Sequence, residues 1–428
     1  MLSKADNDLL TLSGPGTPCG NFMRRFWHPV ALAREVAPGA APLPLTLFGQ
    51  DFVLFRDEQK RLGLLDRNCP HRGADLSYGR LEDGGLRCIY HGWLLDVNGH
   101  CLDQPGEPEG SKFCEKIRHP TYPLVERAGT IWAYLGTGQP PQFPNYEFLT
   151  VPEPQVAANK AFQECNFQQA NEGNIDYLHL SFLHFSRGAD RGDESDPFSG
   201  RGAAPNRESI EVEPVPAGLR VCKVRQMRDG RRHIYMGTYM VPSAFAFFAV
   251  SMHGDALDGY SVNWHVPITD GTHWKFMFNF NRAAVAARGF GGGGQLTTDY
   301  RPVLNKANRY GQDRAIMRTD SFSGFATSFI AQDACVTEGA GPIVDRTKEH
   351  LGVSDISVIQ GRRMMLDGIR AVMAGREAPY SIHDAKQNGF DWPFVWNGIV
   401  PSDMDWRAFF ADMGADGSTR RALSETVT

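Results

Sequence analysis

The chain has 428 residues, of which 42% are hydrophobic and 22% are charged, and its formal net charge is −5. This length predicts two or three domains, and the charge balance gives no basic stripe for nucleic acid. The sequence has no run of eighteen apolar residues, so no membrane span is predicted, and the charged N-terminus is unlike a signal peptide. The eight cysteines lack framework spacing, which favours reduced thiols in a cytoplasmic protein, with a Cys101–Cys114 disulfide as the alternative.

The first part of the chain is predicted to be rich in β-strands. Apolar runs indicate strands at 51–55, 62–65, 93–96 and 130–136, with an Asn-Gly turn at 98–99. A proline-rich stretch at 136–148 marks a domain boundary near residue 145. We therefore expect one domain over residues 1–145 and a second over 146–428.

The second part is predicted to combine helices with an antiparallel sheet. A helical segment runs to about residue 185, and a polar loop at 186–209 follows it as a cover for an active-site mouth. Five β runs follow at 218–227, 232–241, 244–250, 260–268 and 273–281, with Asp-Gly hairpin signals at 229–230 and 270–271. Glycines 289–294 indicate a surface loop, and a helix over 355–374 is expected to pack on the sheet. The fold class is α+β, with a small all-β domain and a larger domain of antiparallel sheet backed by helices.

Two mixed ligand pairs are the most informative motifs of the chain. They read Cys69-Pro-His71 and Cys88-Ile-Tyr-His91, sixteen residues apart, and a glycine follows each pair. Two thiolates and two imidazoles form the ligand set of a Rieske [2Fe–2S] cluster. A structural zinc site accepts the same residue types but usually pairs Cys with Cys and His with His. The spacing therefore favours the Rieske cluster over zinc.

A second candidate metal site lies about 85 residues downstream, in Asp176-x2-His179-x4-His184. Asp176 and His179 share a face of any helix through this segment, whereas His179 and His184 diverge on a regular helix. A π-bulge or a helix end between the two histidines is needed to bring them to one metal. Two imidazoles and one carboxylate form the facial triad of non-haem iron oxygenases.

With both motifs, the chain resembles the Rieske non-haem iron aromatic-ring hydroxylating oxygenases, specifically the oxygenase (alpha) component of the phthalate 4,5-dioxygenase group. The resemblance covers nearly the whole length, including residues 2–30 and 332–366. It implies that 1–145 holds an N-terminal segment and the Rieske domain, and that 146–428 is the catalytic non-haem iron domain. It also implies a Rieske [2Fe–2S] cluster and a mononuclear Fe(II) as cofactors.

The resemblance also implies roles for two carboxylates. The third iron ligand is expected at Asp333, after Gln332, with Asp345 and Asp355 as alternatives; Asp345 is more typical of a capping or ion-pair residue. Asp176 is expected to link His91 of one subunit to His179 of its neighbour by accepting N–H from both imidazoles. Orientation of His179 alone is the simpler alternative for Asp176.

The expected function follows from this resemblance. A separate NAD(P)H-dependent reductase is the implied electron donor, because the chain has no nicotinamide, flavin or all-Cys ferredoxin motif. The implied assembly is a homotrimer or stacked trimers, and the implied reaction is dioxygenation of an aromatic carboxylate with O2. The alternatives are a Rieske monooxygenase or demethylase, an oxygenase of a sterol, amine or alkaloid, a pure electron carrier and a zinc-binding interaction module.

The substrate residues are predicted from charge. An aromatic carboxylate needs a cation in an apolar pocket, and Arg207 and Arg225 are the candidates, with surface positions as the alternative. Tyr235 stands about where the phthalate enzymes of the group carry an Arg, which favours a monocarboxylate such as a substituted benzoate or phenoxybenzoate over phthalate. Candidate ring contacts are Phe245, Phe247 and Phe248.

Overall fold

The short β runs of the first domain form three small antiparallel sheets in the computed structural model, which describes residues 1–185, 208–248, 259–282, 295–325, 328–390 and 394–412. The strand orders are β1-β10-β9, β2-β3-β4 and β5-β6-β7-β8. The predicted strands at 51–55, 62–65, 93–96 and 130–136 correspond to β3, β4, β7 and β10. The bounds are β1 Trp27–Leu32, β2 Leu43–Leu47, β3 Gln50–Arg56, β4 Leu62–Asp66, β5 Arg80–Glu82, β6 Gly85–Arg87, β7 Leu94–Leu95, β8 Cys101–Asp103, β9 Leu124–Arg127 and β10 Thr130–Tyr134, with 3-10 turns η1 Ala33–Val36, η2 Leu76–Tyr78 and η3 Cys114–Lys116.

The larger domain is built on one antiparallel sheet with the strand order β11-β17-β16-β15-β14-β13-β12, and β18 also pairs with β14. The five predicted β runs become β13 to β17, and both Asp-Gly pairs lie in the expected hairpins. The strands β11 and β12 were not predicted, because polar residues interrupt their apolar residues and leave no continuous apolar run. The bounds are β11 Val156–Gln163, β12 Glu208–Val215, β13 Gly218–Gln226, β14 Arg232–Met240, β15 Ala244–Phe247, β16 Gly259–Thr269, β17 Thr272–Asn281 and β18 Trp396–Val400.

Helices lie against this sheet, as predicted. The helix expected over 355–374 is α6, which contacts β12 and β13 and the N-terminal helices. Ile359 of this helix is 38% exposed and lies outside its buried face. The bounds are α1 Lys4–Thr11, α2 Pro18–Met23, α3 Glu147–Thr150, α4 Phe167–Ile175, α5 Phe329–Gly339, α6 Ile356–Met373 and α7 Trp406–Asp412, with 3-10 turns η4 Glu153–Gln155, η5 Leu178–Ser181, η6 Lys306–Gly311, η7 Arg346–Lys348, η8 Val353–Asp355 and η9 Ala385–Gln387.

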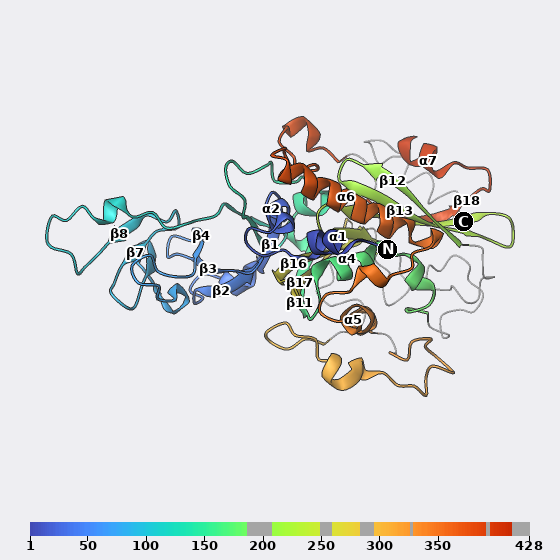
Figure 1. Cartoon of the computed structure of the whole chain (residues 1–428), viewed down its shortest axis with the longest axis horizontal. Helices are drawn as coiled ribbons and strands as arrows, with labels where there is room; N and C mark the ends of the chain where they lie inside the picture. The colour runs from blue at the N-terminus through green and yellow to red at the C-terminus, as the bar shows by residue number, and fades with distance from the viewer. Residues whose placement is uncertain (186–207, 249–258, 283–294, 326–327, 391–393, 413–428) are drawn as a thin grey trace.

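The first two helices belong spatially to the larger domain. Figure 1 shows α1 and α2 beside α6, while β2 to β8 extend to the other end of the molecule. The contact with α6 is close, because a Cβ on Gly368 would lie 2.6 Å from the ring of Phe22. The segment before β1 therefore packs with the catalytic part of the chain, although it precedes the small domain in sequence. A boundary near residue 145 stays a prediction.

The two domains are also joined by a buried ion pair. Lys160 on β11 lies 2.7 Å from Glu35 of η1, and its side chain is 3% exposed. Its ammonium group lies over the rings of Trp274 and Tyr300. These contacts attach the small domain to the first strand of the large sheet.

Two predicted loops lie outside the described residues, wholly or almost wholly. The loop at 186–209 lies almost wholly outside the described residues, and the glycines at 289–294 lie wholly outside them. All eight cysteines lie in the described part and are free thiols, including Cys101 and Cys114. Among the described helices, none is both long and apolar enough to cross a membrane.

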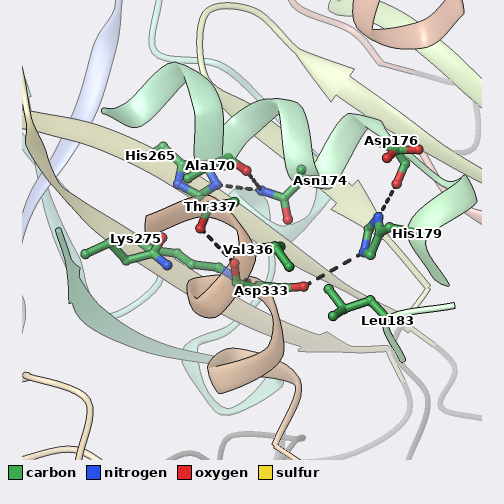
Figure 2. A pocket seen from close by; sticks show the side chains of 12 residues that line it. Ala170, Asn174, Asp176, His179, Leu183, His265, Lys275, Asp333, Val336 and Thr337 are labelled. Atoms are coloured by element: carbon green, nitrogen blue, oxygen red, sulfur yellow. Dashed lines mark hydrogen bonds and ion pairs between the residues drawn. The ribbon is translucent and has the colours of Figure 1, made fainter. Parts of the chain in front are cut away.

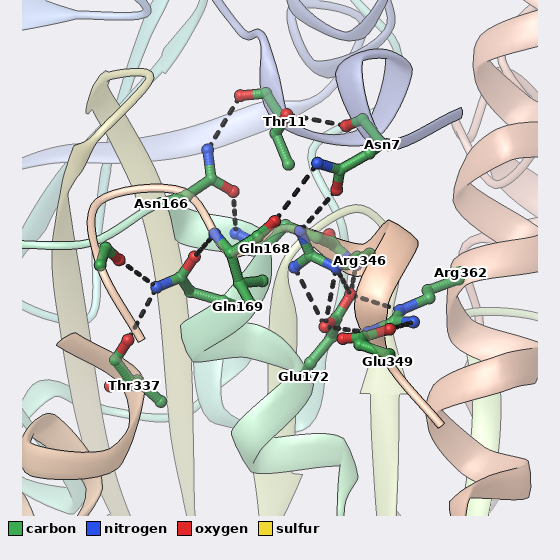
Figure 3. A network of polar contacts seen from close by, with 12 residues as sticks. Asn7, Thr11, Asn166, Gln168, Gln169, Glu172, Thr337, Arg346, Glu349 and Arg362 are labelled. Atoms are coloured by element: carbon green, nitrogen blue, oxygen red, sulfur yellow. Dashed lines mark hydrogen bonds and ion pairs between the residues drawn. The ribbon is translucent and has the colours of Figure 1, made fainter. Parts of the chain in front are cut away.

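A buried network of charges joins four parts of the larger domain (Figure 3). The carboxylate of Glu172 on α4 accepts hydrogen bonds from Arg346 at 3.0 Å and from Arg362 of α6 at 2.7 Å. Arg346 also donates to Asn7 of α1 at 3.0 Å. Burial by itself would raise the pKa of Glu172, but the two arginines lower it to about 2. The stabilisation from this charge is therefore present above the ordinary carboxyl pKa and is lost as the pH falls towards 2.

Replacing Glu172 with Gln should reduce the free energy of unfolding by about 3–5 kcal/mol, because two buried arginines lose their shared carboxylate. Chemical denaturation at neutral pH measures this loss. Glu126→Gln is the matched control, because Glu126 pairs with Arg56 while its own side chain is 37% exposed. The control should cost less than about 1 kcal/mol. Equal losses in the two variants would contradict the importance of the buried network.

Candidate metal centres

The two Cys-x1–2-His loops have the same backbone design. The N–H of Cys69 donates to the carbonyl of Ala74, and the N–H of Gly73 donates back to the carbonyl of Cys69. The second loop repeats this pattern, from Cys88 to the carbonyl of Trp93 and from Gly92 to the carbonyl of Cys88. Gly73 and Gly92 have φ values of +73° and +76°, which favour glycine. Each loop is therefore a tight turn that begins at its cysteine.

The four side chains of these loops converge in the small domain. Cys69 and Cys88 are 3% exposed and interact with each other, and the rings of His71 and His91 have centroids 4.5 Å apart. The ring of Trp93 stacks on that of His71, with centroids 4.6 Å apart and planes 7° apart. Two buried thiols behind two outer imidazoles fit a cluster with one all-Cys iron and one all-His iron.

The second candidate site is built where α4 ends. The helix stops at Ile175, Asp176 is its C-cap in extended conformation, and His179 lies in the short 3-10 turn η5. His184 follows in the next turn, where the N–H of Leu183 donates to the carbonyl of His179 at 2.8 Å. Of the two predicted ways to bring the histidines together, the structure has the helix end.

His179, His184 and Asp333 meet at one point (Figure 2 shows His179 beside Asp333). The Nε2 atoms of the two histidines are 3.1 Å apart. Oδ1 of Asp333, on α5, lies 3.1 Å from Nε2 of His184 and 3.9 Å from Nε2 of His179. Two imidazole nitrogens and one carboxylate oxygen within 4.8 Å of one another fit a facial triad for iron.

Acceptors behind both histidines fix which ring nitrogens face the triad. Nδ1 of His179 lies against the main-chain carbonyl of Asp176, and Nδ1 of His184 lies 2.5 Å from Oε1 of Gln332. Since each of these oxygens can only accept, each Nδ1 is protonated and each Nε2 is left to bind a metal. Burial and then the neighbouring His184 lower the pKa of His179, which favours its neutral, ligating form.

The carboxylate of Asp333 is suited to carry a negative charge. Burial by itself would raise its pKa, but His184, Lys275 and His179 together hold the pKa well below the ordinary value. Its two oxygens face different groups, since Oδ1 faces the histidines and Oδ2 lies 3.9 Å from the ammonium of Lys275.

The carboxylate of Asp176 does not make its predicted contact with His179 within one chain. It accepts the N–H of Leu178 at 2.9 Å, and the main-chain carbonyl of Asp176 takes Nδ1 of His179 instead. The reason is the helix end, which leaves that carbonyl without a helical partner. Asp176 still lines the same cavity as His179.

The two alternative third ligands have local roles. Asp345 caps η7 through the N–H of Thr347 and pairs with Lys348 at 3.0 Å, which agrees with its expected capping and ion-pair role. Asp355 accepts the N–H of Gly352 at 2.6 Å. Neither belongs to the described group of three metal-competent side chains.

The predicted substrate residues that the structure describes lie on or next to β13, β14 and β15. Arg225, on β13, is 1% exposed and donates to Glu208 at 2.8 Å, and Glu208 also accepts from Ser181 of η5. Tyr235, on β14, is 2% exposed, and its ring lies 4.8 Å from that of Tyr177. Of the ring candidates, Phe245 is buried, while Phe247 and Phe248 are partly buried. Arg207 lies outside the described residues.

A cavity of about 90 Å3 adjoins the triad. Its described wall comes from α4, α5 and the strands β11, β16 and β17 (Figure 2). Both carboxylates, Asp176 and Asp333, line it together with His179. Solvent and small molecules can therefore reach the candidate metal position.

Sequence reasoning missed several side chains that orient this site. Gln332 was noted only as the neighbour of Asp333, and Trp93 only as part of a strand. Lys275 carried a usable signal, because it is a charge inside the apolar run 273–281. A cation at a buried strand position usually has a specific partner.

Comparisons with known proteins agree with this geometry. The Rieske [2Fe-2S] domain family matches residues 26–123, and the "LigXa C-terminal domain like" family matches residues 133–427. The chain is 34% identical to a phthalate 4,5-dioxygenase oxygenase subunit of Pseudomonas putida, over 96% of this chain and 95% of that protein. It is 29% identical to a 3-chlorobenzoate-3,4-dioxygenase oxygenase subunit of Comamonas testosteroni, over 95% and 97%.

Two further similarities extend the range of reactions among the relatives. The chain is 30% identical to a 5,5'-dehydrodivanillate O-demethylase oxygenase subunit of a Sphingobium strain, over 91% of this chain and 85% of that protein. Its fold is similar to that of dicamba monooxygenase bound to dicamba, with a TM-score of 0.58, 19% identity, and coverage of 83% of this chain and all of that one.

The two family matches divide the chain between the same two centres that the geometry brings out. The relatives matched over nearly the whole chain are oxygenase subunits of multicomponent systems. The family carries a Rieske [2Fe–2S] cluster and a mononuclear catalytic iron. The chain therefore belongs to the Rieske non-haem iron ring-hydroxylating dioxygenases, with a small all-β Rieske domain and a larger catalytic domain of antiparallel sheet and helices.

Proposed function

We propose that this chain is the terminal oxygenase subunit that dioxygenates an aromatic monocarboxylate, such as a substituted benzoate or phenoxybenzoate. The observation that carries the proposal is the meeting of His179, His184 and Asp333 beside a cavity, in a chain that also has the Cys/His loops. Iron held by these three side chains would supply O2 activation next to the bound ring. Delivery of both oxygen atoms to adjacent ring carbons gives a cis-dihydrodiol.

We assign the ligands as follows. Cys69, His71, Cys88 and His91 hold the cluster, and the neutral Nε2 atoms of His179 and His184 bind the mononuclear iron with Oδ1 of Asp333. Gln332 and the carbonyl of Asp176 keep the two imidazoles in the ligating tautomer.

The electron donor is a separate NAD(P)H-dependent reductase, which takes a hydride and delivers single electrons to the cluster. A donor that draws on NAD(P)H places the system in the cytoplasm, and the eight free cysteines are compatible with that compartment.

Electrons cross between subunits of a homotrimer or of stacked trimers in this proposal. The supporting observation is the arrangement in Figure 1, where β4 and β7, which flank the Cys/His loops, lie at the opposite end of the chain from α4 and α5. His91 of one subunit would then approach Asp176 of its neighbour. Because the carboxylate of Asp176 is not taken by His179, one of its oxygens is available to a second imidazole.

The aromatic carboxylate is supported by the names of two relatives, which act on phthalate and 3-chlorobenzoate. The monocarboxylate is supported by Tyr235, a buried phenol where the phthalate enzymes of the group are expected to carry a cation. An O-demethylase among the relatives and a monooxygenase among the structural neighbours favour monooxygenation or demethylation as the second candidate reaction. An oxygenase of a sterol, amine or alkaloid is the remaining alternative.

Changing His179, His184 or Asp333 to Ala should remove the mononuclear iron and leave the EPR signal of the reduced cluster intact, because the two centres share no ligand. Iron analysis and EPR measure both. Asp345→Ala is the control, since that carboxylate only caps η7, and it should keep a full complement of iron. Loss of the cluster signal in a histidine variant would refute the assignment of the two sites.

Asp176→Asn should retain both metal centres, because an amide oxygen can still accept the N–H of Leu178. Turnover should nevertheless collapse, since an amide carries no negative charge to stabilise a neighbouring imidazole. Hybrid trimers with a His91-disabled chain provide the sharper test. They should regain activity only where an intact His91 faces an intact Asp176 across an interface, and inactive hybrids would indicate transfer within one chain.

The substrate proposal predicts oxygen-dependent NAD(P)H oxidation coupled to product with aromatic monocarboxylates, and weak or absent turnover of phthalate. A panel of benzoates, phenoxybenzoates, phthalate isomers and neutral arenes, with product analysis, checks this. Efficient coupled oxidation of phthalate, or of neutral arenes without any response to carboxylates, would refute it and leave the iron chemistry standing.

A further inference from the structure

A single buried cation faces the cavity beside the triad. Among the residues described as lining this cavity, Lys275 is the one lysine or arginine. It lies on β17, and its side chain is 6% exposed. Figure 2 shows its amine beside Asp333, at the same wall of the cavity.

The ammonium of Lys275 lies near the carboxylate of Asp333 but does not form a hydrogen bond with it. Its closest described carboxylate oxygen is Oδ2 of Asp333 at 3.9 Å, which is beyond hydrogen-bond distance. No hydrogen bond from this ammonium to another described residue accompanies that contact. A buried ammonium whose three N–H donors lack protein acceptors is costly unless water or a ligand accepts them.

His265 does not supply a second cation at this wall. Its Nε2 lies 2.5 Å from the amide nitrogen of Asn174, which can only donate, so this Nε2 is unprotonated. Burial, then His273 and Lys275, lower the pKa of His265 well below the ordinary value. The strand register places neutral His265 directly opposite Lys275, so Lys275 is the candidate cation of this described wall.

The opposite wall of the cavity carries little side-chain volume. Ala170 and Gly173 are three apart on α4, so they share one face of the helix and line the cavity with almost no side-chain volume. Leu183 and Val336 add apolar surface next to His179. The rest of the described lining is polar and includes the carboxylates of Asp176 and Asp333, so Lys275 is the lining side chain that can form a charge-assisted hydrogen bond with an anionic substrate.

We propose that Lys275 anchors the carboxylate of the substrate and thereby sets the specificity for aromatic acids. This inference rests on the proposed function and names the group that recognises the substrate. It assigns to β17 the role that sequence reasoning gave to Arg207 and Arg225. Arg225 is already held by Glu208, whereas Lys275 lines the cavity that reaches His179 and Asp333.

The test is equilibrium binding of benzoate to the oxidised holoenzyme by isothermal titration calorimetry, with chlorobenzene as the uncharged probe. Lys275→Met should raise the Kd for benzoate about 10- to 100-fold, because one charge-assisted hydrogen bond is lost. The Kd for chlorobenzene should change less than about threefold. Lys275→Arg, which keeps the charge, should retain most of the affinity for benzoate.

Lys160→Met is the matched control, because Lys160 is also a buried lysine of this sheet but pairs with Glu35 away from the cavity. It should leave the Kd for benzoate unchanged. Because Lys275 lies near Asp333, its substitution could lower the iron content of the enzyme. The titrations are therefore repeated on wild type and variants after chelation of the mononuclear iron, so that a difference in iron content cannot cause the change in Kd.

Three outcomes contradict the inference. An unchanged Kd for benzoate in Lys275→Met would refute the inference, and this holds for any result obtained with an Arg225→Met variant. An equal loss of benzoate affinity in Lys160→Met would also refute it. An equal loss for chlorobenzene would assign Lys275 to the shape of the cavity instead of to charge. If the wild-type enzyme binds none of the aromatic acids, the proposed function itself is refuted. This case is distinguished from a failure of the Lys275 inference alone, because in the latter the wild-type enzyme still binds benzoate.

Discussion

The buried carboxylate of Glu172 is the interaction on which the arrangement of the catalytic domain depends. It lies one turn before the end of α4, and its main-chain carbonyl accepts the N–H of Asp176. The arginines that hold it come from η7 and α6, and one of them also holds α1. A shift of any of these segments would leave a charge buried without its partner, so the end of α4 has one favoured position. The turn that carries His179 and His184 begins at that position.

The end of α4 solves a geometric and a chemical problem together. A continuous helix would direct His179 and His184 to different faces, while the extended C-cap at Asp176 lets the chain turn back. The same helix end frees the carbonyl of Asp176, which accepts Nδ1–H of His179. One break in a helix therefore brings two ligands together and fixes the tautomer of one of them. It also directs the carboxylate of Asp176 to the N–H of Leu178 instead of to His179.

The Rieske cluster could be predicted from the motifs because its ligand residues have a fixed spacing in the sequence. The Cys69/His71 and Cys88/His91 loops are closed by local backbone hydrogen bonds, so their conformation does not depend on distant segments. Strand existence was also predictable where apolar runs were continuous. The position of α1 on α6 was not predicted, and the helix end was predicted only as one of two possibilities, since both features depend on partners such as Arg346, 174 residues from Glu172. Asp333 came from the family resemblance, because nothing in its local sequence distinguishes a ligand from a helical surface carboxylate. Substrate residues were the weakest predictions because the register of the large sheet decides which cation faces the cavity.

That register explains why two buried lysines of one sheet differ in function. Lys160 and Lys275 lie on the paired strands β11 and β17, where Lys160 is opposite Phe276, the residue after Lys275. Because successive side chains of a strand alternate between faces, Lys160 and Lys275 lie on opposite faces of the sheet. One face meets the small domain, where Glu35 neutralises Lys160 at 2.7 Å. The other face meets α4 and α5, where the only described carboxylate near Lys275 is that of Asp333, with Oδ2 at 3.9 Å. A charge kept in such a place without a hydrogen-bonded protein partner is best explained by a substrate that brings the partner with it.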